Sequence, residues 1–187
     1  LSYVLVAATT VLFASGEFAA GLVLGWLMTF LDTVDGKLAR VTLTSSRLGN
    51  VLDHGLDLVH PPIWWAAFAW GLAGGAEFAG WELSLAIVIG GYLVGRVLEG
   101  AFMLAFDQEM FTWRPFDGLF RQVIARRNPN LLLLSAGTAA GAAGTGFLLV
   151  AAWTLGSIAI QIVRIAQAFA LKSAGVPIRS WYEEEPP

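Results

Sequence analysis

Long apolar stretches alternate with short polar segments along the 187 residues of the chain. Six of these stretches approach the ~20 residues that a membrane-spanning helix needs, and they lie at about 1–14, 18–38, 49–72, 83–106, 131–150 and 153–172. Hydrophobic residues make up 57% of the sequence and charged residues only 13%, which leaves too much apolar surface for a soluble domain of this size. The pattern therefore predicts an all-α, polytopic membrane protein with six transmembrane helices.

The two ends of the chain suggest how the domain is bounded. The sequence begins at Leu1 rather than at a methionine, so we expect an N-terminus truncated within a longer first helix. This segment has neither the basic flank nor the small-residue cleavage site of a signal peptide. We expect a single transmembrane domain over 1–187, in which 173–187 form a cytoplasmic tail whose last residues are solvated and disordered. Since the chain has no cysteine, disulfides and thiolate metal sites are excluded.

Basic residues are unevenly distributed between the predicted helices. They gather at 31–48, at 107–130 and after the sixth stretch, whereas the opposite loops carry Glu17, Glu77 and Glu82 and no Lys or Arg. The positive-inside bias places the basic loops in the cytoplasm, and we expect an integral protein of a prokaryotic cytoplasmic membrane. Within 107–130, aromatic and basic residues are mixed as in an amphipathic helix at the membrane surface. A plain surface loop is the alternative.

Four aspartates stand out in the segment LDTVDGKLARVTLTSSRLGNVLDHGLDLVH, residues 31–60. Asp32 and Asp35 are three residues apart, and Asp53 and Asp57 are four apart, so each pair shares one face of its helix. A connector of about ten residues makes the two helices antiparallel neighbours. The spacing predicts that all four carboxylates converge in a cleft that faces the cytoplasm.

A cluster of four ionised carboxylates needs a cation, because mutual repulsion and desolvation both oppose it. Oxygen-only ligands suit Mg²⁺ or Mn²⁺, and two such ions would balance the four charges and leave coordination positions for phosphate oxygens. Gly36, Ala39 and Gly49 keep the helices narrow beside the carboxylates, and Arg40 follows within reach of a phosphate. We therefore predict a two-metal cleft for a pyrophosphate. The alternative is that the aspartates are merely solvated at a helix end.

The same residues form a pattern that resembles the signature of the CDP-alcohol phosphotransferase family: Asp32-x2-Asp35-Gly36-x2-Ala39-Arg40-x8-Gly49-x3-Asp53-x3-Asp57. The resemblance implies that a CDP-linked alcohol is cleaved at its pyrophosphate, that CMP leaves, and that the phosphoryl-alcohol moves to an acceptor hydroxyl. It also implies a homodimer. The family's Pro-Asn and Thr/Ser element near the start of its first helix does not appear here, so that side of the nucleotide site is unassigned.

The resemblance further implies a role for each matching residue. The two metal ions would be held by Asp32, Asp35 and Asp53, with a contribution from Asp57, and Asp57 would also be the general base on the acceptor hydroxyl. The CDP group would be bound by the remaining positions of the pattern: Gly36, Ala39, Arg40 and Gly49.

The leading hypothesis is a membrane enzyme of phospholipid biosynthesis that uses CDP-diacylglycerol or a similar CDP-lipid. Its acceptor would be a phosphorylated polyol such as inositol phosphate or glycerol phosphate, and we expect no nucleic-acid partner. One alternative is a CDP-linked polar head group transferred to a lipid or soluble alcohol. A divalent-cation transporter is an alternative of another class, but it would place acidic residues near mid-bilayer on several helices. A structural or assembly protein would not need four convergent aspartates.

Two arginines, Arg96 and Arg164, lie inside predicted spans, where a charge needs a partner or a water-filled cavity. One interpretation is that both bind an anionic acceptor. The other is internal pairing, for example of Arg96 with Glu99 one turn along the helix.

Two further features concern helix geometry. Pro61 and Pro62 fall inside the third stretch, where they leave the carbonyls of Asp57 and Leu58 without intrahelical donors. The hypothesis is a kink that opens the acceptor pocket, and a merely structural kink is the alternative. The small-residue run SAGTAAGAAGTG at 135–146 permits close helix approach, either at a dimer seam or within one chain.

Overall fold

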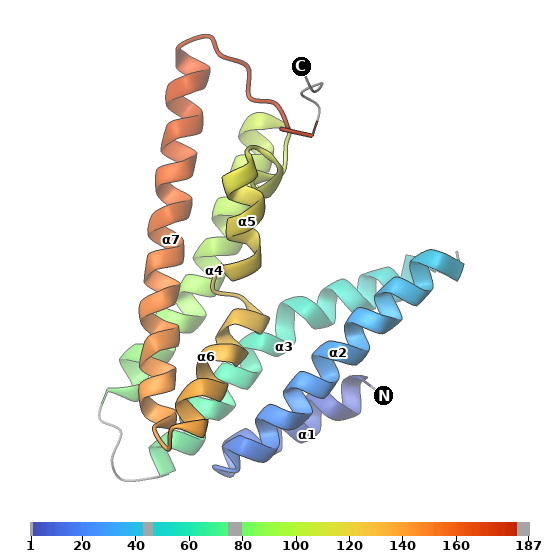
Figure 1. Ribbon diagram of the computed structural model, residues 1–187, viewed down its shortest axis with the longest axis vertical. Coiled ribbons are helices and arrows are strands. Elements are labelled where there is room, and N and C mark those ends of the chain that lie inside the picture. Colours follow the sequence, from blue (N-terminus) through green and yellow to red (C-terminus); the bar gives the residue numbers. More distant parts are fainter. Residues whose placement is uncertain (1, 43–46, 75–79, 183–187) are drawn as a thin grey trace.

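The structure is a computed structural model that describes residues 2–42, 47–74 and 80–182, with side chains described up to Val34 and again from Leu58 onward in the first two ranges. This part of the chain contains seven α-helices and one short 3₁₀ helix (Figure 1). None of the described residues lies in a β-strand, which confirms the predicted all-α class. The elements are α1 (Ser2–Ala14), α2 (Phe18–Thr42), α3 (Arg47–Gly74), α4 (Trp81–Phe106), η1 (Met110–Thr112), α5 (Pro115–Val123), α6 (Arg127–Ala139) and α7 (Ala143–Ser173).

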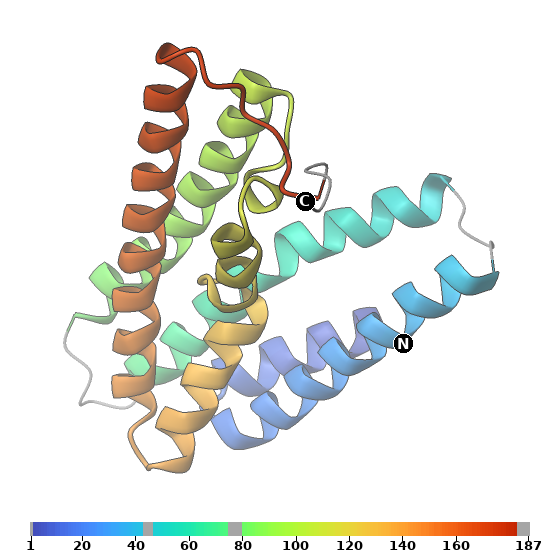
Figure 2. The same cartoon turned by 45° about the horizontal axis from the view of Figure 1, so that its top comes forward.

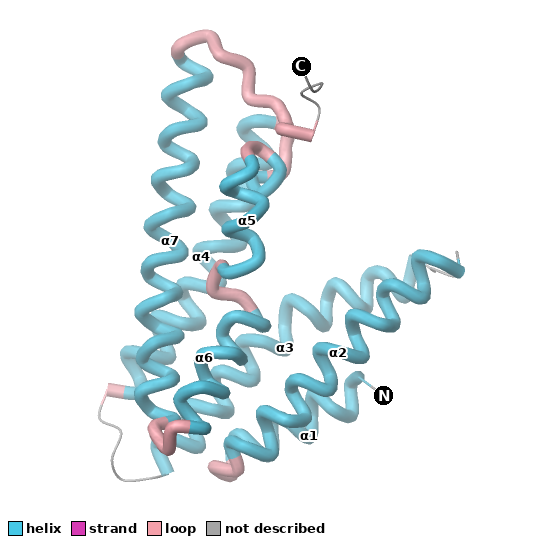
Figure 3. The backbone as a smooth tube through the Cα atoms, viewed as in Figure 1, coloured by secondary structure: helices cyan, strands magenta, loops and turns pink. Residues whose placement is uncertain are grey.

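The helices form an upright bundle and a projecting arm. α4 and α7 pack against each other along the bundle, with α5 beside them and α6 against the lower part of α7 (Figures 1 and 2). The arm consists of α2 and α3, and α1 packs against both. Figure 3 shows that most connections between described helices are short, so neighbours in sequence are also neighbours in space.

The hydrophobic core lies where α1, α3 and α7 meet. Phe13, Phe68 and Phe147 are fully buried, with ring centroids 5.1 Å apart for the first two and 5.9 Å apart for the last two. Aromatic pairs of this kind contribute about 0.5–1.5 kcal/mol beyond the burial of their area. The core therefore fixes this part of α3, and with it His60 and Pro61, which lie two turns before Phe68 in the same helix.

Two described helices, α4 and α7, are long and apolar enough to cross a membrane. Their outward side chains include Leu93, Leu104 and Leu155, all of which are exposed, as expected of a surface that lipid tails cover. The apolar helix α1 and the 18–34 part of α2 are shorter. The apolar helical architecture is confirmed, whereas six transmembrane helices with a cytoplasm-facing cleft stay a prediction.

The predicted span 131–150 is wrong, because it runs across a turn, whereas the predicted span 153–172 lies within one helix that begins earlier. α6 ends at Ala139 and α7 begins at Ala143, and Gly141 between them has a φ of +69°, a conformation that glycine adopts without strain. Across this turn, a Cβ built on Gly137 would lie 2.6 Å from the Cα of Gly146. The small-residue run at 135–146 therefore makes a tight helical hairpin within the chain, which is the intramolecular alternative.

The segment after α7 folds back against the bundle. Residues 174–182 turn back towards η1 (Figure 3). The Trp181 backbone N–H and the Ser180 hydroxyl donate to the Thr112 carbonyl at 3.2 and 3.0 Å, and Ile178 packs on the cluster around Phe102. Residues 183–187 lie outside the described part of the chain.

Candidate active site

The predicted aspartate cluster belongs to the arm. Asp32 and Asp35 lie on α2, and Asp53 and Asp57 lie on α3; the two helices project together from the bundle (Figures 1 and 2). Of these four side chains only that of Asp32 is described. Among the described side chains, no three acidic residues or histidines come together as a metal site. The convergence of the four carboxylates therefore stays a prediction.

The predicted CDP site falls on the same part of the arm. Its backbone belongs to α2 and α3, but its side-chain surroundings lie outside the described residues: Gly36, Ala39, Arg40 and Gly49.

Asp32 is paired with an arginine from another helix. Its Oδ2 accepts a hydrogen bond from Arg127 Nη2 at 2.8 Å, and the two side chains are only 15% and 16% exposed. Arg127 is the first residue of α6, so the pair joins α2 to α6. A carboxylate at this depth needs a positive neighbour. The carboxylate oxygens of Asp32 are ligands that suit a divalent metal ion. In this structure the Arg127 guanidinium provides the positive charge beside them.

Arg127 has further neighbours around the same point. Its Nη1 lies 3.4 Å from His60 Nε2 and 3.9 Å from Met28 Sδ, and its Nε donates to Asn128 Oδ1 at 3.3 Å. His60 is buried and packs edge-on against Trp64. Because a guanidinium only donates hydrogen bonds, His60 Nε2 would be the acceptor of a hydrogen bond here.

A cavity of about 380 Å³ opens beside the Asp32–Arg127 pair. We term it the arginine pocket, because four arginines from α4, α5 and the start of α6 line it: Arg96, Arg121, Arg126 and Arg127. The other residues of its wall are Pro61, Tyr92, Gln122, Asn128 and Pro129. None of these described wall residues is acidic. The pocket is therefore suited to an anionic ligand.

The position of the basic residues on α6 strengthens this interpretation. Arg126 is the N-cap and Arg127 the first residue of the helix. The N-terminus of a helix already carries partial positive charge, so cations there are unfavourable and anions are favoured. Two arginines at this end oppose the stability of the isolated helix, and a bound anion would remove the conflict.

Glu99 positions two of the pocket arginines. Its Oε1 accepts hydrogen bonds from Arg96 Nη2 at 2.9 Å, from Arg126 Nη2 at 2.8 Å and from Gln161 Nε2 at 3.4 Å. One carboxylate neutralises only one of the two guanidinium charges. The internal pairing expected for Arg96 is thus present, and it leaves Arg96 on the pocket wall.

Arg164 has a different environment from Arg96. Its Nε and Nη2 each donate to the Asp117 carboxylate at 2.7 Å, and its Nη1 donates to Gln167. Asp117 is 1% exposed, and the guanidinium lies 4.4 Å from the centroid of the Trp113 ring. Arg164 does not line the arginine pocket. The geometry is that of an internal pair between α5 and α7, and acceptor binding by Arg164 stays an untested prediction.

The proline pair borders the arginine pocket. Pro61 and Pro62 lie within α3, and Pro61 forms part of the pocket wall. The Leu58 carbonyl, which Pro62 leaves without an intrahelical donor, accepts a hydrogen bond from Tyr92 Oη at 3.0 Å. α4 therefore supplies the donor that α3 lacks, and the hypothesis that the prolines open an acceptor pocket stays a prediction.

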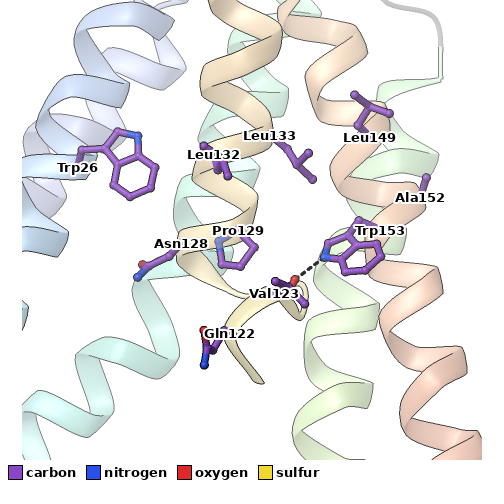
Figure 4. A pocket seen from close by; sticks show the side chains of 10 residues that line it. All are labelled: Trp26, Gln122, Val123, Asn128, Pro129, Leu132, Leu133, Leu149, Ala152 and Trp153. Carbon is purple, nitrogen blue, oxygen red and sulfur yellow. Dashed lines mark hydrogen bonds between the residues drawn. The ribbon is translucent and has the colours of Figure 1, made fainter. Parts of the chain in front are cut away.

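An apolar groove of about 620 Å³ adjoins the arginine pocket (Figure 4). Its apolar lining comes from α2, α5, α6 and α7: Trp26, Val123, Leu132, Leu133, Leu149, Ala152 and Trp153. Trp153 Nε1 donates to the Val123 carbonyl at 2.6 Å and fixes one wall. The groove and the pocket share Gln122, Asn128 and Pro129. A ligand with an apolar tail and an anionic head therefore finds both environments side by side.

Sequence reasoning missed part of this site. Arg121, Arg126 and Arg127 contributed only to the predicted cytoplasmic placement of 107–130 and to its predicted amphipathic helix, and Asp117 and His60 received no role. One available signal was the placement of two arginines immediately before an apolar helix, where basic charge opposes the helix dipole. The partners of these residues carry no local signal, because they come from other helices.

Comparison with known proteins identifies relatives of the chain. The CDP-alcohol phosphatidyltransferase family model matches residues 1–111, a range that includes all four aspartates. The "Phosphatidylinositol phosphate synthase" of Mycobacteroides abscessus is 38% identical over 72 residues, which are 35% of this chain and 33% of that protein. The chain thus spans about a third of the length of this curated relative. No solved structure matches the chain.

Proposed function

Because the chain belongs to the CDP-alcohol phosphatidyltransferase family, we propose that it transfers a phosphoryl-alcohol group from a CDP-linked alcohol to an acceptor hydroxyl, with release of CMP. The process it serves in this proposal is phospholipid synthesis in a prokaryotic cytoplasmic membrane, by a homodimer whose site faces the cytoplasm. The arginine pocket beside Asp32 is the structural observation that supports it. This pocket brings an anion site next to the helices that carry the family signature.

The acceptor in this proposal is a phosphorylated polyol such as inositol phosphate or glycerol phosphate. Guanidinium groups bind phosphate through paired hydrogen bonds, and the pocket offers four of them in about 380 Å³. Arg96 contributes to this binding, as the sequence suggested. The name of the curated relative points to the same acceptor class.

The donor in this proposal is CDP-diacylglycerol or a similar CDP-lipid. The apolar groove offers a place for an acyl chain directly beside the arginine pocket, so the lipid tail stays in an apolar environment. The nucleotide would lie on the arm, along Gly36, Ala39, Arg40 and Gly49. A CDP-linked polar head group with a lipid acceptor is the alternative, and it would leave the arginine pocket without an anionic polyol.

The chemistry assigns separate tasks to the residues of the arm. Asp32, Asp35, Asp53 and Asp57 would hold two Mg²⁺ or Mn²⁺ ions, which when bound supply positive charge to the phosphate oxygens. Asp57 accepts the proton of the acceptor hydroxyl. The acceptor oxygen then bonds to the phosphorus that carries the lipid, the bond from this phosphorus to the CMP oxygen breaks, and CMP leaves with the electron pair.

CMP release by the full chain, purified in detergent, tests this function. Radiolabelled CDP-diacylglycerol is incubated with inositol phosphate, glycerol phosphate, free inositol or serine. We expect CMP with a phosphorylated polyol and little with the uncharged alcohol. A chelator should abolish the reaction, and Mg²⁺ or Mn²⁺ should restore it. Absence of CMP with every acceptor, together with divalent-cation flux in liposomes, would instead establish the transporter alternative.

A further inference from the structure

Arg127 takes part in two sites at once. Its Nη2 donates to Asp32, a predicted metal ligand, at 2.8 Å, while its side chain also lines the arginine pocket. Among the described salt bridges, no other arginine of the pocket pairs with Asp32. Arg127 therefore links Asp32 directly to the arginine pocket.

A metal ion and Arg127 compete for the same carboxylate. Both are cations that need Asp32 within bonding distance, and like charges held that close repel strongly in a partly buried site. The Arg127 guanidinium also contacts His60, Met28 and Asn128 at 3.3 to 3.9 Å. The side chain is long and 16% exposed, and one of its sides already faces the pocket.

We propose that Arg127 is an exchangeable counter-ion of the metal site. It neutralises Asp32 while no metal is bound, and on metal binding it moves into the arginine pocket and binds the anion there. This inference rests on the proposed function, because it takes Asp32 as a metal ligand. It implies that metal and anionic acceptor each favour the binding of the other, since coupling between two sites is reciprocal.

The neighbouring residue Arg126 provides a matched control. It lies on the same pocket wall and differs by one position, but its Nη2 pairs with Glu99 at 2.8 Å instead of with Asp32. Loss of either arginine removes one positive charge from the pocket. Only the loss of Arg127 removes the competitor of the metal.

The first experiment measures Mn²⁺ binding to the full chain in detergent, without substrates, by titration calorimetry. Arg127→Gln should bind Mn²⁺ about 10-fold more tightly than the natural chain, within the usual range of coupling between sites. Arg126→Gln should change this affinity less than about 2-fold, because screening weakens charges that are not in contact. A merely structural role for Arg127 predicts the opposite sign, since disruption of the arm would weaken metal binding.

The second experiment needs no variant and so does not depend on how Arg127→Gln folds. The natural chain is treated briefly with phenylglyoxal, which modifies accessible guanidinium groups, and modification of each arginine is read by peptide mass spectrometry. Addition of Mn²⁺ should raise the modification of Arg127 several-fold. That of exposed Arg114 should not change.

The outcomes separate this inference from the function on which it rests. Tighter Mn²⁺ binding by Arg127→Gln and metal-dependent exposure of Arg127 would support the exchange. Normal Mn²⁺ binding by the natural chain, with no tightening in Arg127→Gln and unchanged labelling, would overturn the exchange and leave the metal-dependent function standing. No Mn²⁺ binding by either chain would overturn both.

Discussion

Arg164 and Arg127 each pair with an aspartate from a different helix, but the two pairs differ in depth and geometry. Arg164 makes two hydrogen bonds of 2.7 Å to Asp117, which is 1% exposed. Arg127 makes one hydrogen bond of 2.8 Å to Asp32, which is 15% exposed. A buried bidentate pair is costly to break, whereas a carboxylate that is partly exposed can exchange its cation more easily. The first pair therefore suits a permanent joint between α5 and α7, and the second suits a site that changes partners.

The strongest test of this difference removes the buried carboxylate. Asp117→Ala should lower the free energy of unfolding by about 3–5 kcal/mol, because it leaves the charge of Arg164 buried without its partner. Thermal and denaturant unfolding in detergent measure the change. The double variant Asp117→Leu/Arg164→Met should recover most of the loss, since apolar side chains of similar volume replace both charges. A loss below about 1 kcal/mol in Asp117→Ala would contradict a buried joint.

The matching change at the exchangeable pair should affect activity more than stability. Asp32→Asn keeps the shape of the side chain but removes a predicted metal ligand, and we expect CMP release to fall about 100-fold or more. The free energy of unfolding should fall less than in Asp117→Ala, because the amide oxygen of the variant can still accept a hydrogen bond from Arg127 and the pair is less deeply buried. Full activity of Asp32→Asn would remove Asp32 from the metal site, and destabilisation equal to that of Asp117→Ala would erase the distinction between the pairs.

Variants of Arg96 and Arg164 distinguish a role in acceptor binding from a role in joining α5 to α7. Arg96→Gln should raise the KM for a phosphorylated acceptor about 10-fold, which corresponds to the loss of one charge-assisted hydrogen bond, and should leave the KM for the CDP-lipid unchanged. Steady-state kinetics with each substrate varied in turn measure both values. Arg164→Lys, which keeps the charge outside the pocket, is the control. An equal rise in both KM values for Arg96→Gln would contradict its place in the acceptor site.

The smallest effect on the free energy of unfolding is expected at the exposed ion pair between Arg121 and Glu109. This pair serves as the reference for the Arg164–Asp117 and Arg127–Asp32 pairs. Arg121 Nη1 lies 3.8 Å from Glu109 Oε2, and the side chains are 53% and 58% exposed. Glu109→Gln should change the free energy of unfolding by less than about 0.5 kcal/mol, because water already solvates both groups. Denaturant unfolding of Glu109→Gln and Asp117→Ala under the same conditions compares the two changes in free energy. A change above about 1 kcal/mol would mean that exposure does not rank these pairs.

The sequence predicts most of the helical architecture because apolar stretches between polar connectors are a local property. It fails at the α6–α7 turn for a physical reason. Hydropathy stays high through 131–150, and the helix ends because Gly141 adopts a positive φ and Gly137 meets Gly146. A run of small apolar residues has the same hydropathy whether it lies within one helix or at the contact between two helices.

In the candidate site, too, the sequence predicts the local features and misses those that depend on tertiary packing. Helical spacing places Asp32 and Asp35 on one face without knowledge of the fold, and bilayer energetics correctly indicate that Arg164 needs a partner. The identity of that partner, 47 residues away, and the arrival of Arg127 at Asp32 across 95 residues are set by tertiary packing. The arginine pocket is missed because its wall is assembled from four separate helices, α3, α4, α5 and α6, and the connection before α6.

The meeting of Gly137 and Gly146 sets a distance at the far end of α6. Arg127 lies ten residues before Gly137, or about 15 Å along the helix. A change in the angle between α6 and α7 at the glycine contact would therefore move Arg127. A methyl group at position 137 would clash with the backbone of Gly146, so α6 and α7 would separate there and α6 would tilt. The close contact of these two glycines therefore contributes to where Arg127 lies relative to Asp32.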